Sequence, residues 1–509
     1  MANLADHLFR QARERGDKLA LVYGEDRYNF ADIADRVCKI AGGLAAAGVS
    51  TGSRVGLLVT ARPEFIFFQQ ALFALGATVS PLNTFYKESE ILHVVESCDL
   101  DHLVITEEFI DRLPSAGTIG LETLKKIIVV DRLPEKEDPR LFAATDGPPI
   151  TGPVDLPDGA IVLMLNTSAT TGKAKGVMLS LANIRENYDR TPNWLGLDSD
   201  TVTLCALPLY NTFGLNQCVN ALMVTGGTMV LLSRFNAMQC IEAIERYHCN
   251  FFPAVPTMLQ KVIDHPEAPQ HDLTHIKRIM TGGAPVPAAL LERIYGTMGD
   301  DTVVITGYGL TEGTALATTE EIALDANGKV RRPKSIGKPV SNVALRLITE
   351  DGREAERGEV GEICMRGPNV MQGYYKRPEE SAAAVVNGWL HTGDLGIVDD
   401  DGYFYIVDRK KDLIIRGGQN IYPADIEEVL YQAPGVAEVA VIGLPDDILG
   451  EVPFAYVALK PGADVTAEAL LARCKQELAQ YKLPKGIEFL PELPKGPTGK
   501  ILKRALRPG

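Results

Sequence analysis

The chain has 509 residues, which exceeds the length at which one hydrophobic core usually stops growing, so we expect two or more domains. Hydrophobic residues make up 46% and charged residues 23%, a globular balance that argues against long disordered segments. The formal net charge of −15 disfavours nucleic acid and anionic membrane surfaces as partners. Any anionic ligand must therefore be held by a few local cations and by backbone dipoles.

The N-terminal segment 1–18 lacks the apolar core of a secretory signal. The most apolar early stretch, Val55–Leu82, is interrupted by charged residues and a proline at positions 62–64, so it does not predict a membrane span. Eight cysteines are scattered without a C-x-x-C pair or a zinc spacing, which indicates free thiols in a reducing compartment. We therefore expect a cytoplasmic protein without an integral membrane segment. The sequence leaves the oligomeric state open.

Short apolar runs alternate with helical patterns through most of the chain. Arg54–Thr60 predicts a buried strand, and Glu64–Leu75 predicts a helix packed on it. Further strands are predicted at Leu103–Ile105, Lys126–Val130, Ile161–Leu165, Met229–Leu232, Ile279–Thr281 and Val303–Thr306. Strands separated by helices of this length indicate an α/β fold with parallel sheets covered on both faces.

The pattern changes from about Gly337. Short strands with Gly and Asp turns then predict a distorted, barrel-like β region, with strands at Val343–Ile348, Gly361–Arg366, Gly396–Asp399 and Tyr403–Val407. A compact α+β tail follows, with elements near Pro423–Gln432, Val436–Gly443, Pro453–Lys460 and Ala467–Gln480. The charged, turn-prone segment between the two patterns favours a linker. We predict a large N-terminal domain at 1–408, a hinge at 409–412 and a small C-terminal domain at 413–509.

A polar loop follows the predicted strand Ile161–Leu165. It runs from Asn166 to Gly176 and contains hydroxyl side chains, glycines and two lysines. Backbone N–H groups, hydroxyls and an ammonium group together suit the binding of phosphate oxygens. The spacing of a Walker loop is absent. Taken alone, the loop is equally typical of a solvent-exposed Ser/Thr/Gly connection.

Further polar motifs follow this loop in order. They are Gly282–Pro285, Tyr308–Glu312, Thr392–Asp394, Asp408–Arg409 and Pro497–Lys500. Each has an ordinary structural explanation by itself, such as a βα turn or a solvated charge cluster. Their joint order and intervals resemble the adenylate-forming (AMP-binding) superfamily, which includes acyl-CoA synthetases, firefly luciferases and the adenylation domains of peptide synthetases. The resemblance covers nearly the whole chain and implies an adenylate-forming enzyme fold, in which a hinge joins a mobile C-terminal domain.

This resemblance implies an ATP-dependent, AMP-forming acyl-CoA synthetase with ATP, Mg²⁺ and coenzyme A as cofactor and co-substrates. It implies catalytic roles for Lys175, Thr311, Glu312 and Lys500, with Glu312 as the magnesium ligand. The implied ATP- or AMP-binding residues are Thr167, Ser168, Thr170, Thr171, Gly172, Lys175, Gly283, Ala284, Pro285, Tyr308, Gly309, Thr311, Asp394, Ile406, Arg409 and Lys500.

The same resemblance places the hinge at Lys411 and the approach of CoA at Gly417, Gly418 and Gln419. The implied acyl pocket consists of mostly small or apolar residues, which suits a fatty, aromatic or alicyclic acid: Asn211, Phe213, Phe252, Val255, Gly283, Gly309 and Thr314. No Asp or Glu occurs between Pro208 and Gln217, which argues against an amino-acid substrate. No carrier domain follows Gly509, so we do not expect a module of a longer synthetase.

The chain departs from the family pattern at three positions. Ala169 and Ala174 stand where the phosphate loop usually has Gly and Pro, and Asn211 stands where many relatives have His. An added Cβ disfavours positive φ, and an Asn carries no titratable charge. These departures favour one alternative, an enzyme that mainly thioesterifies a supplied acyl adenylate. Two further alternatives stay open independently of them, an acid:carrier-protein ligase and a non-catalytic nucleotide-binding protein.

Overall fold

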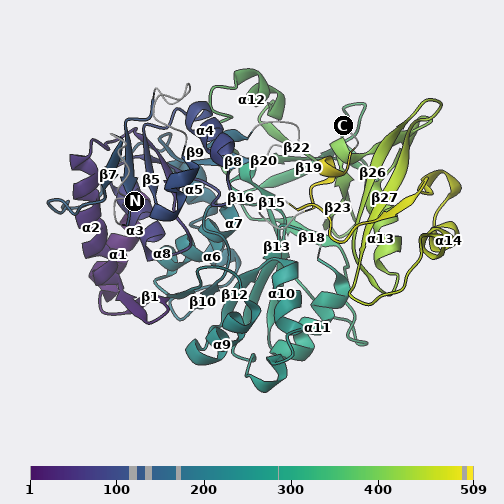
Figure 1. The fold of residues 1–509 in the computed structure, drawn as a ribbon, viewed down its shortest axis with the longest axis horizontal. Helices are drawn as coiled ribbons and strands as arrows, with labels where there is room; N and C mark the ends of the chain where they lie inside the picture. The colour runs from purple at the N-terminus through teal and green to yellow at the C-terminus, as the bar shows by residue number, and fades with distance from the viewer. Residues whose placement is uncertain are drawn as a thin grey trace. The chain divides into compact units, whose positions relative to one another are not determined.

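The computed structural model describes residues 2–113, 123–131, 140–167, 174–284, 286–495 and 501–507 (Figure 1). The chain forms two compact units. The larger unit comprises Met1–Leu345 and Met365–Leu390, and the smaller comprises Arg346–Cys364 and His391–Gly509. The predicted domain boundary at residue 408 is defined by the proposed hinge at 409–412 and not by the compactness of the two units. It stays a prediction.

A sheet of seven described strands lies in the N-terminal part of the larger unit, in the order β7-β6-β5-β3-β4-β8-β9. All pairs are parallel except β8 with β9. Strands β3 to β5 are almost wholly buried, as expected of a parallel sheet covered on both faces. The bounds are β3 (Arg54–Leu58), β4 (Thr78–Pro81), β5 (His102–Ile105), β6 (Lys126–Val129), β7 (Leu141–Ala143), β8 (Ile161–Thr167) and β9 (Lys175–Ser180).

Helices of this part include α2 (Phe30–Ala46), α3 (Pro63–Ala74), α4 (Glu88–Ser97) and α5 (Leu181–Asn187). A capping box between Asn29 and Asp32 starts α2. A proline in the first turn starts α3, and every residue of α3 except Glu64 is buried. An all-buried helix of this kind lacks the one-sided apolar stripe of a surface helix, because protein packs around its whole circumference.

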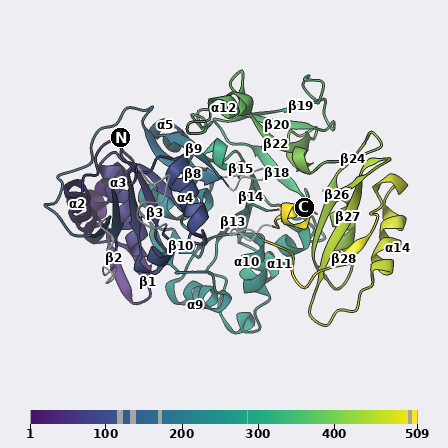
Figure 2. The ribbon, with the colours of Figure 1, turned by 45° about the horizontal axis from the view of Figure 1, so that its top comes forward.

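A second series of strands in the larger unit runs in the order β18-β17-β14-β13-β12-β10-β11-β1-β2. The pairs from β14 through to β1 are parallel, whereas β2, β17 and β18 pair antiparallel. Figures 1 and 2 show α9 (Ala237–Tyr247), α10 (Pro256–Ile263) and α11 (Ala288–Met298) gathered along the lower edge of this unit. The strand bounds are β1 (Leu19–Tyr23), β2 (Asp26–Asn29), β10 (Val202–Cys205), β11 (Thr228–Leu231), β12 (Phe251–Ala254), β13 (Arg278–Gly282), β14 (Val303–Gly307), β17 (Thr318–Glu321) and β18 (Ser335–Pro339).

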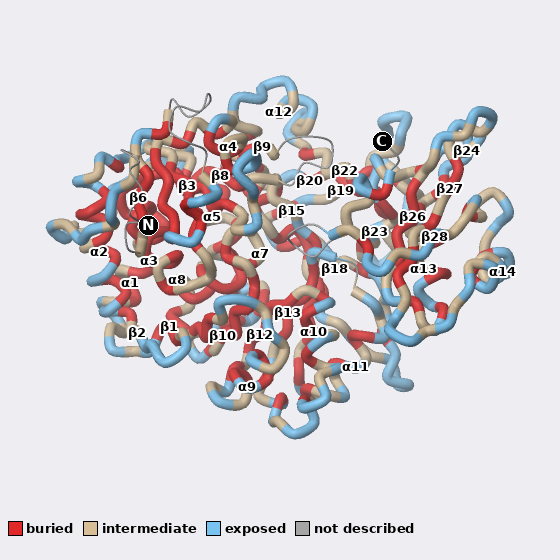
Figure 3. Tube along the Cα trace, in the orientation of Figure 1, coloured by how far each residue is buried: buried red, intermediate tan, exposed pale blue. Residues whose placement is uncertain are grey.

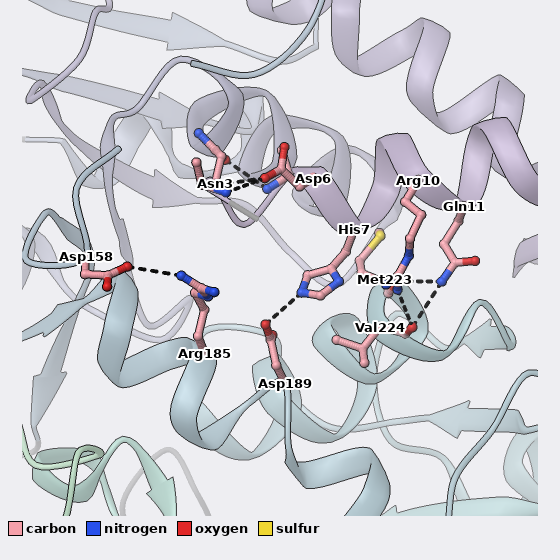
Figure 4. A network of polar contacts seen from close by, with 12 residues as sticks. Asn3, Asp6, His7, Arg10, Gln11, Asp158, Arg185, Asp189, Met223 and Val224 are labelled. Carbon is pink, nitrogen blue, oxygen red and sulfur yellow. Dashed lines mark hydrogen bonds and ion pairs between the residues drawn. The ribbon is translucent and has the colours of Figure 1, made fainter. Parts of the chain in front are cut away.

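The N-terminal helix α1 (Asp6–Arg15) is tied to the rest of the larger unit by buried polar contacts (Figure 4). His7 Nε2 lies 2.8 Å from Asp189 Oδ2, and Gln11 donates to the carbonyls of Met223 and Val224. Asn3 Nδ2 donates to the Phe73 carbonyl at 2.7 Å. Buried polar groups need such partners, so these contacts fix how α1 docks.

The smaller unit begins with strands β19, β20, β22 and β23, which are neighbours in that order. It continues into a five-stranded sheet of described residues in the order β25-β24-β27-β26, with β28 on β27. Buried positions concentrate on β26 and β27 and on α13, which form one apolar core (Figure 3). The bounds are β19 (Ala344–Ile348), β20 (Gly361–Arg366), β22 (Trp389–Val398), β23 (Phe404–Arg409), β24 (Ile414–Arg416), β25 (Gln419–Ile421), β26 (Val436–Asp446), β27 (Gly450–Leu459), β28 (Ile487–Phe489), α13 (Pro423–Tyr431) and α14 (Ala467–Glu477).

Two predicted elements end at least two residues earlier in the structure. The strand expected to reach Thr60 ends at Leu58. The helix expected to reach Gln480 ends at Glu477, because Leu478 adopts extended backbone angles (φ −117°, ψ 147°). The helical pattern of the sequence therefore extends past the last helical turn.

Candidate functional site

The polar loop after β8 is closed at its base by strand pairing. β8 and β9 form an antiparallel ladder in which Thr167 is opposite Lys175. Just before Lys175, the Ala174 carbonyl lies 2.8 Å from His93 Nε2 of α4. The predicted residues Ser168, Thr170, Thr171 and Gly172 lie outside the described residues, as does Ala169. The structure thus fixes both stems of the predicted phosphate loop.

Lys175 faces two residues that the sequence analysis did not select. Its ammonium forms an ion pair with Glu380 and lies 4.9 Å from the ring centroid of Tyr374. Tyr374 in turn donates its hydroxyl to Glu312 Oε1 at 3.0 Å. Burial, together with the nearby Glu312 carboxylate, raises the pKa of the Tyr374 hydroxyl and keeps it a donor. Tyr374 therefore connects the predicted phosphate lysine with the predicted magnesium carboxylate.

Two predicted nucleotide-binding segments leave the same edge of the second sheet. β13 and β14 are parallel and end in register at Gly282 and Gly307, so Gly283–Ala284 and Tyr308–Glu312 start side by side. The carboxyl ends of parallel strands are the usual place for ligands in such sheets. Tyr308 is mostly buried, and its carbonyl accepts from the backbone of Ala317. Pro285 lies outside the described residues.

Gly309 has a steric reason to be glycine. It belongs to β15 (Gly309–Leu310), which pairs with β16 (Ala315–Leu316). A Cβ on Gly309 would lie 1.5 Å from the Ala315 carbonyl oxygen, a distance that no side chain can tolerate. The close approach of these two short strands thus explains the glycine without reference to a ligand.

The predicted acyl-pocket residue Asn211 caps a helix. Its side-chain oxygen accepts from the backbone N–H of Gly214 at 3.0 Å, at the start of α7 (Thr212–Gly214). The adjacent Thr212 hydroxyl lies 2.7 Å from the Tyr188 hydroxyl and donates to the Thr314 carbonyl at 3.2 Å. The structure therefore brings the Asn211 loop and Thr314 together, and their shared role in a pocket stays a prediction.

The remaining candidates for the acyl pocket differ in how deeply they are buried. Thr314 is fully buried in a left-handed conformation (φ 66°), and its hydroxyl donates to the Asn369 carbonyl. Phe252 is fully buried inside β12, so it belongs to the core of the sheet. Val255 and Phe213 are half-buried, at the start of α10 and in α7.

In the smaller unit, β22 and β23 bring Asp394 opposite Arg409. Arg409 Nε lies 2.9 Å from Asp394 Oδ1, and Asp394 is only 4% exposed. Ile406, the third predicted nucleotide-binding residue of these strands, is 37% exposed. A buried acceptor beside a half-exposed guanidinium can bind hydroxyl groups and an anion at one place.

Sequence reasoning missed Glu362 on β20. Its carboxylate accepts from Lys410 Nζ at 3.0 Å and from the Gly393 backbone at 3.1 Å, and it lies 3.2 Å from His391 Nδ1. Glu362 thereby joins the Thr392–Asp394 turn to the residue next to Lys411. A charged residue within an otherwise apolar strand was the available signal for this role.

Lys411 lies in a short 3₁₀ turn, Lys410–Asp412, and is exposed. Desolvation by the surrounding protein atoms lowers the pKa of its ammonium group, against the opposing effect of Asp412. Gly417 and Gly418 form the two-residue turn of the β24–β25 hairpin with φ of 56° and 80°, as in type I′ turns. The hairpin alone explains both glycines, and Gln419 follows as the first residue of β25.

Lys500 lies outside the described residues. The residues on either side, Lys495 and Ile501, form an antiparallel bridge. Lys495 is paired with Glu438 and Glu492. The structure therefore places only the residues that flank the predicted catalytic lysine.

Within the described part of the chain, no three His, Cys, Asp or Glu residues gather into a group that could hold a metal. Nor does any helix in the described ranges have the length and apolarity to cross a membrane. All eight cysteines, each of them in a described range, are free thiols.

Comparisons with known proteins agree with this arrangement. Residues 8–375 match the family model "AMP-binding enzyme", and residues 425–500 match "AMP-binding enzyme C-terminal domain". A feruloyl-CoA synthase from Amycolatopsis sp. is 37% identical over 98% of this chain and 97% of its own length. A 3-[(3aS,4S,7aS)-7a-methyl-1,5-dioxo-octahydro-1H-inden-4-yl]propanoyl:CoA ligase from Rhodococcus jostii is 34% identical over 98% of this chain and 97% of its own length.

Among solved structures, the o-succinylbenzoate CoA synthetase of Bacillus subtilis superposes with a TM-score of 0.84 at 31% identity, covering 98% of this chain and 97% of that one. That structure contains an acyl-adenylate intermediate. Another structure of the same synthetase holds ATP and a magnesium ion. The predicted fold class is confirmed by this similarity.

Proposed function

The chain belongs to the AMP-binding enzyme family, and from this premise we propose that it is an ATP-dependent, AMP-forming acid:CoA ligase for a hydrophobic carboxylic acid. The observation that carries the proposal is the connection of Lys175 to Glu312 through Tyr374. A cation at the stem of a phosphate loop and a carboxylate suited to magnesium are the two groups that activation of a triphosphate requires.

The reaction has two half-reactions. The acid's carboxylate attacks the α-phosphorus of ATP, the bond to the β-phosphate oxygen breaks, and pyrophosphate leaves. The CoA thiol, after losing its proton, then attacks the acyl carbonyl, and AMP leaves with the electron pair of the broken C–O bond. Both attacks bring anions together, so fixed cations stabilise their transition states.

We assign roles to this chain's residues accordingly. Lys175, with Thr167, Ser168, Thr170, Thr171 and Gly172, holds the β- and γ-phosphates. Tyr308 stacks on adenine beside Gly283, Ala284 and Pro285, and Thr311 binds near the α-phosphate. Asp394 accepts from the ribose hydroxyls beside Arg409, and Lys500 bridges the acid's carboxylate and the α-phosphate.

Magnesium has a place in this assignment. Glu312 would hold Mg²⁺ through a carboxylate oxygen, and the bound ion would neutralise charge on the phosphate oxygens. Tyr374 occupies Glu312 Oε1, which orients the carboxylate.

The acid is proposed to carry an aromatic or alicyclic ring. The two sequence relatives and the solved synthetase are named for ring-bearing acids. Asn211 spends its side-chain oxygen on the Gly214 N–H, and Thr314 spends its hydroxyl on Asn369. The side-chain oxygen of Asn211 and the hydroxyl of Thr314 are thus engaged within the protein, and Phe213 and Val255 add apolar surface, which suits a hydrophobic acid.

We further propose that the two half-reactions are separated by rotation about Lys411, with 1–408 and 413–509 as the moving parts. The rotation would exchange Lys500 for the Gly417–Gln419 hairpin turn, which would admit the pantetheine arm of CoA. A reducing, cytoplasmic location is proposed from the eight free thiols.

The experiment that tests this function offers ATP, Mg²⁺ and CoA with ferulate, an alicyclic acid and a fatty acid, and measures pyrophosphate and thioester separately. Pyrophosphate and thioester should form together with a ring-bearing acid. Thioester from purified acyl adenylate without pyrophosphate release would favour the thioesterification-only alternative, and transfer only to a holo-carrier protein would favour a carrier-protein ligase. Full biological activity in Lys500→Ala would favour a non-catalytic nucleotide-binding protein.

A further inference from the structure

A segment distant in sequence runs alongside the exit strand of the phosphate loop. Gln372 N–H donates to the Met178 carbonyl, Met178 N–H to the Gly373 carbonyl, and Tyr375 N–H to the Gly176 carbonyl, at 2.8 to 3.0 Å. These bonds extend the β8–β9 ladder by one further short strand, bridged at Val177 and Tyr374. Residues 372–375 are therefore fixed against β9 through backbone hydrogen bonds.

The helix α12 (Pro378–Ala384) is fixed to this segment. Ser381 Oγ accepts from the Tyr374 backbone N–H at 2.8 Å and donates to the Arg377 carbonyl at 2.6 Å. The first turn of α12 is thus held close to Tyr374. Glu380 belongs to that first turn and forms an ion pair with Lys175 of β9.

Glu380 is the ion-pair partner of Lys175 in this structure. One oxygen pairs with the Lys175 ammonium, and the other lies 3.8 Å from Arg377 Nη1. The Lys175 and Glu380 side chains are 29% and 38% exposed, so water screens the pair and can replace it. The Tyr374 ring beneath Lys175 limits the directions in which the ammonium can move.

We propose that Glu380 is a positioning residue that competes with the β- and γ-phosphates of ATP for Lys175. The proposal rests on the proposed function, in which Lys175 binds those phosphates. When ATP binds, the Lys175 ammonium leaves the Glu380 carboxylate and binds phosphate oxygens. When pyrophosphate dissociates, the ion pair between Lys175 and Glu380 forms again. Glu380 therefore weakens ATP binding and speeds the release of pyrophosphate.

Removing the Glu380 charge should strengthen ATP binding slightly, whereas most substitutions near a binding site weaken it. Because an exposed ion pair contributes little, Glu380→Gln should lower the dissociation constant and KM for ATP about two- to fivefold. Pyrophosphate should also inhibit more strongly, whereas the KM of the acid should stay unchanged. Glu380→Asp, which keeps the charge, should bind ATP less tightly than Glu380→Gln. A variant that only damaged the fold would bind ATP more weakly.

Glu379 provides a matched control, because Glu379→Gln makes the same change in net charge one position earlier on α12. Glu379 is exposed, and it forms no ion pair with any described residue. AMP provides a second control, since it lacks the β- and γ-phosphates. Glu379→Gln should bind ATP as the wild type does, and Glu380→Gln should bind AMP as the wild type does.

The experiment measures ATP and AMP binding by calorimetry for the wild type and the three variants, together with ATP and acid kinetics. Tighter binding of ATP alone in Glu380→Gln supports the proposal. Equal ATP affinity in Glu380→Gln and Glu379→Gln, or an equal gain for AMP, overturns it. No ATP binding by the wild type would instead overturn the proposed function, so the two failures are distinguishable.

Discussion

Arg409 and Asp394 form an ion pair across β22 and β23, with Arg409 Nε 2.9 Å from Asp394 Oδ1. The antiparallel register places the two residues directly opposite each other, so the pairing follows from the strands themselves. Asp394 is almost completely buried, and a buried carboxylate needs hydrogen-bond donors. The ion pair fixes the position of this carboxylate, where we propose that the ribose binds.

Asp394→Asn should weaken nucleotide binding. The change keeps the size of the side chain but removes the charge that would accept from two ribose hydroxyls. Losing charge-assisted hydrogen bonds should raise the dissociation constants of ATP and AMP about 10- to 100-fold. Isothermal titration of both nucleotides measures this. Asp400→Asn, in the exposed turn between β22 and β23, is the control and should bind normally. Equal affinities in the two variants would contradict the ribose role.

Lys411→Pro should separate the two half-reactions. Proline fixes φ at position 411 and restricts the preceding residue, so the chain cannot turn there. Pyrophosphate formation should persist, while thioester formation should fall by about tenfold or more. Lys411→Ala, which leaves the backbone free to rotate, should keep both steps. The ratio of thioester to pyrophosphate in a quenched assay is the measurement. A parallel loss of both products in Lys411→Pro would argue against a hinge at this residue.

Glu362→Gln should destabilise the smaller unit in a pH-dependent way. Burial acts to raise the pKa of the Glu362 carboxyl, but hydrogen bonds from His391 and Lys410 lower it overall. Because the folded pKa lies below the unfolded one, the stabilisation is complete above the unfolded pKa and is lost as pH falls through the folded value. Near pH 7 the free energy of unfolding of the Gln variant should be lower than that of the wild type by about 1 to 3 kcal/mol. Its melting temperature should therefore also be lower.

The difference between wild type and Glu362→Gln should shrink as the pH falls below about 4.5, the ordinary pKa of a glutamate. Melting curves recorded from pH 7 to pH 3 test this directly. Glu356→Gln, which changes an exposed carboxylate in the same connection between β19 and β20, shows how the fold responds to acid without the buried network. A gap between wild type and Glu362→Gln that stays constant with pH would contradict the account.

Asn211 should have two separable roles. Asn211→Ala removes the acceptor for the Gly214 N–H and should cost about 1 kcal/mol of stability through the lost helix cap. Asn211→Asp keeps a good capping acceptor, so the melting temperature should stay near that of the wild type. The new negative charge should nevertheless raise the KM of the acid by repelling its carboxylate. An unchanged acid KM in Asn211→Asp would place residue 211 away from the acid.

The confirmed predictions of individual strands rest on continuous apolar runs. β8 and β14 were predicted because residues such as Ile161–Leu165 and Val303–Thr306 are apolar at successive positions, as in strands buried on both faces. The membership in the adenylate-forming family was predicted from ordered motifs and is confirmed. Local sequence was therefore sufficient to predict these individual strands and the family.

Other features depend on contacts that local sequence does not encode. The π-helix at Leu215–Asn220 has no distinctive pattern in LNQCVN, and it forms where the chain packs against buried side chains. The partners Glu380 and Tyr374 reach Lys175 only because residues 372–375 pair with β9. Gly417 and Gly418 were interpreted as glycines for CoA, whereas the hairpin turn already requires them. The roles of the site residues stay predictions.

The central claim is activation of a carboxylic acid through an acyl adenylate, and isotope transfer tests it most directly. A ring-bearing acid that the enzyme accepts is labelled with ¹⁸O in its carboxylate and incubated with ATP, Mg²⁺ and CoA, and the AMP is analysed by mass spectrometry. Attack of the carboxylate on the α-phosphorus predicts that one labelled oxygen passes to each AMP when the thiol displaces it. Thioester formation with unlabelled AMP, or with ADP and labelled phosphate, would contradict the account.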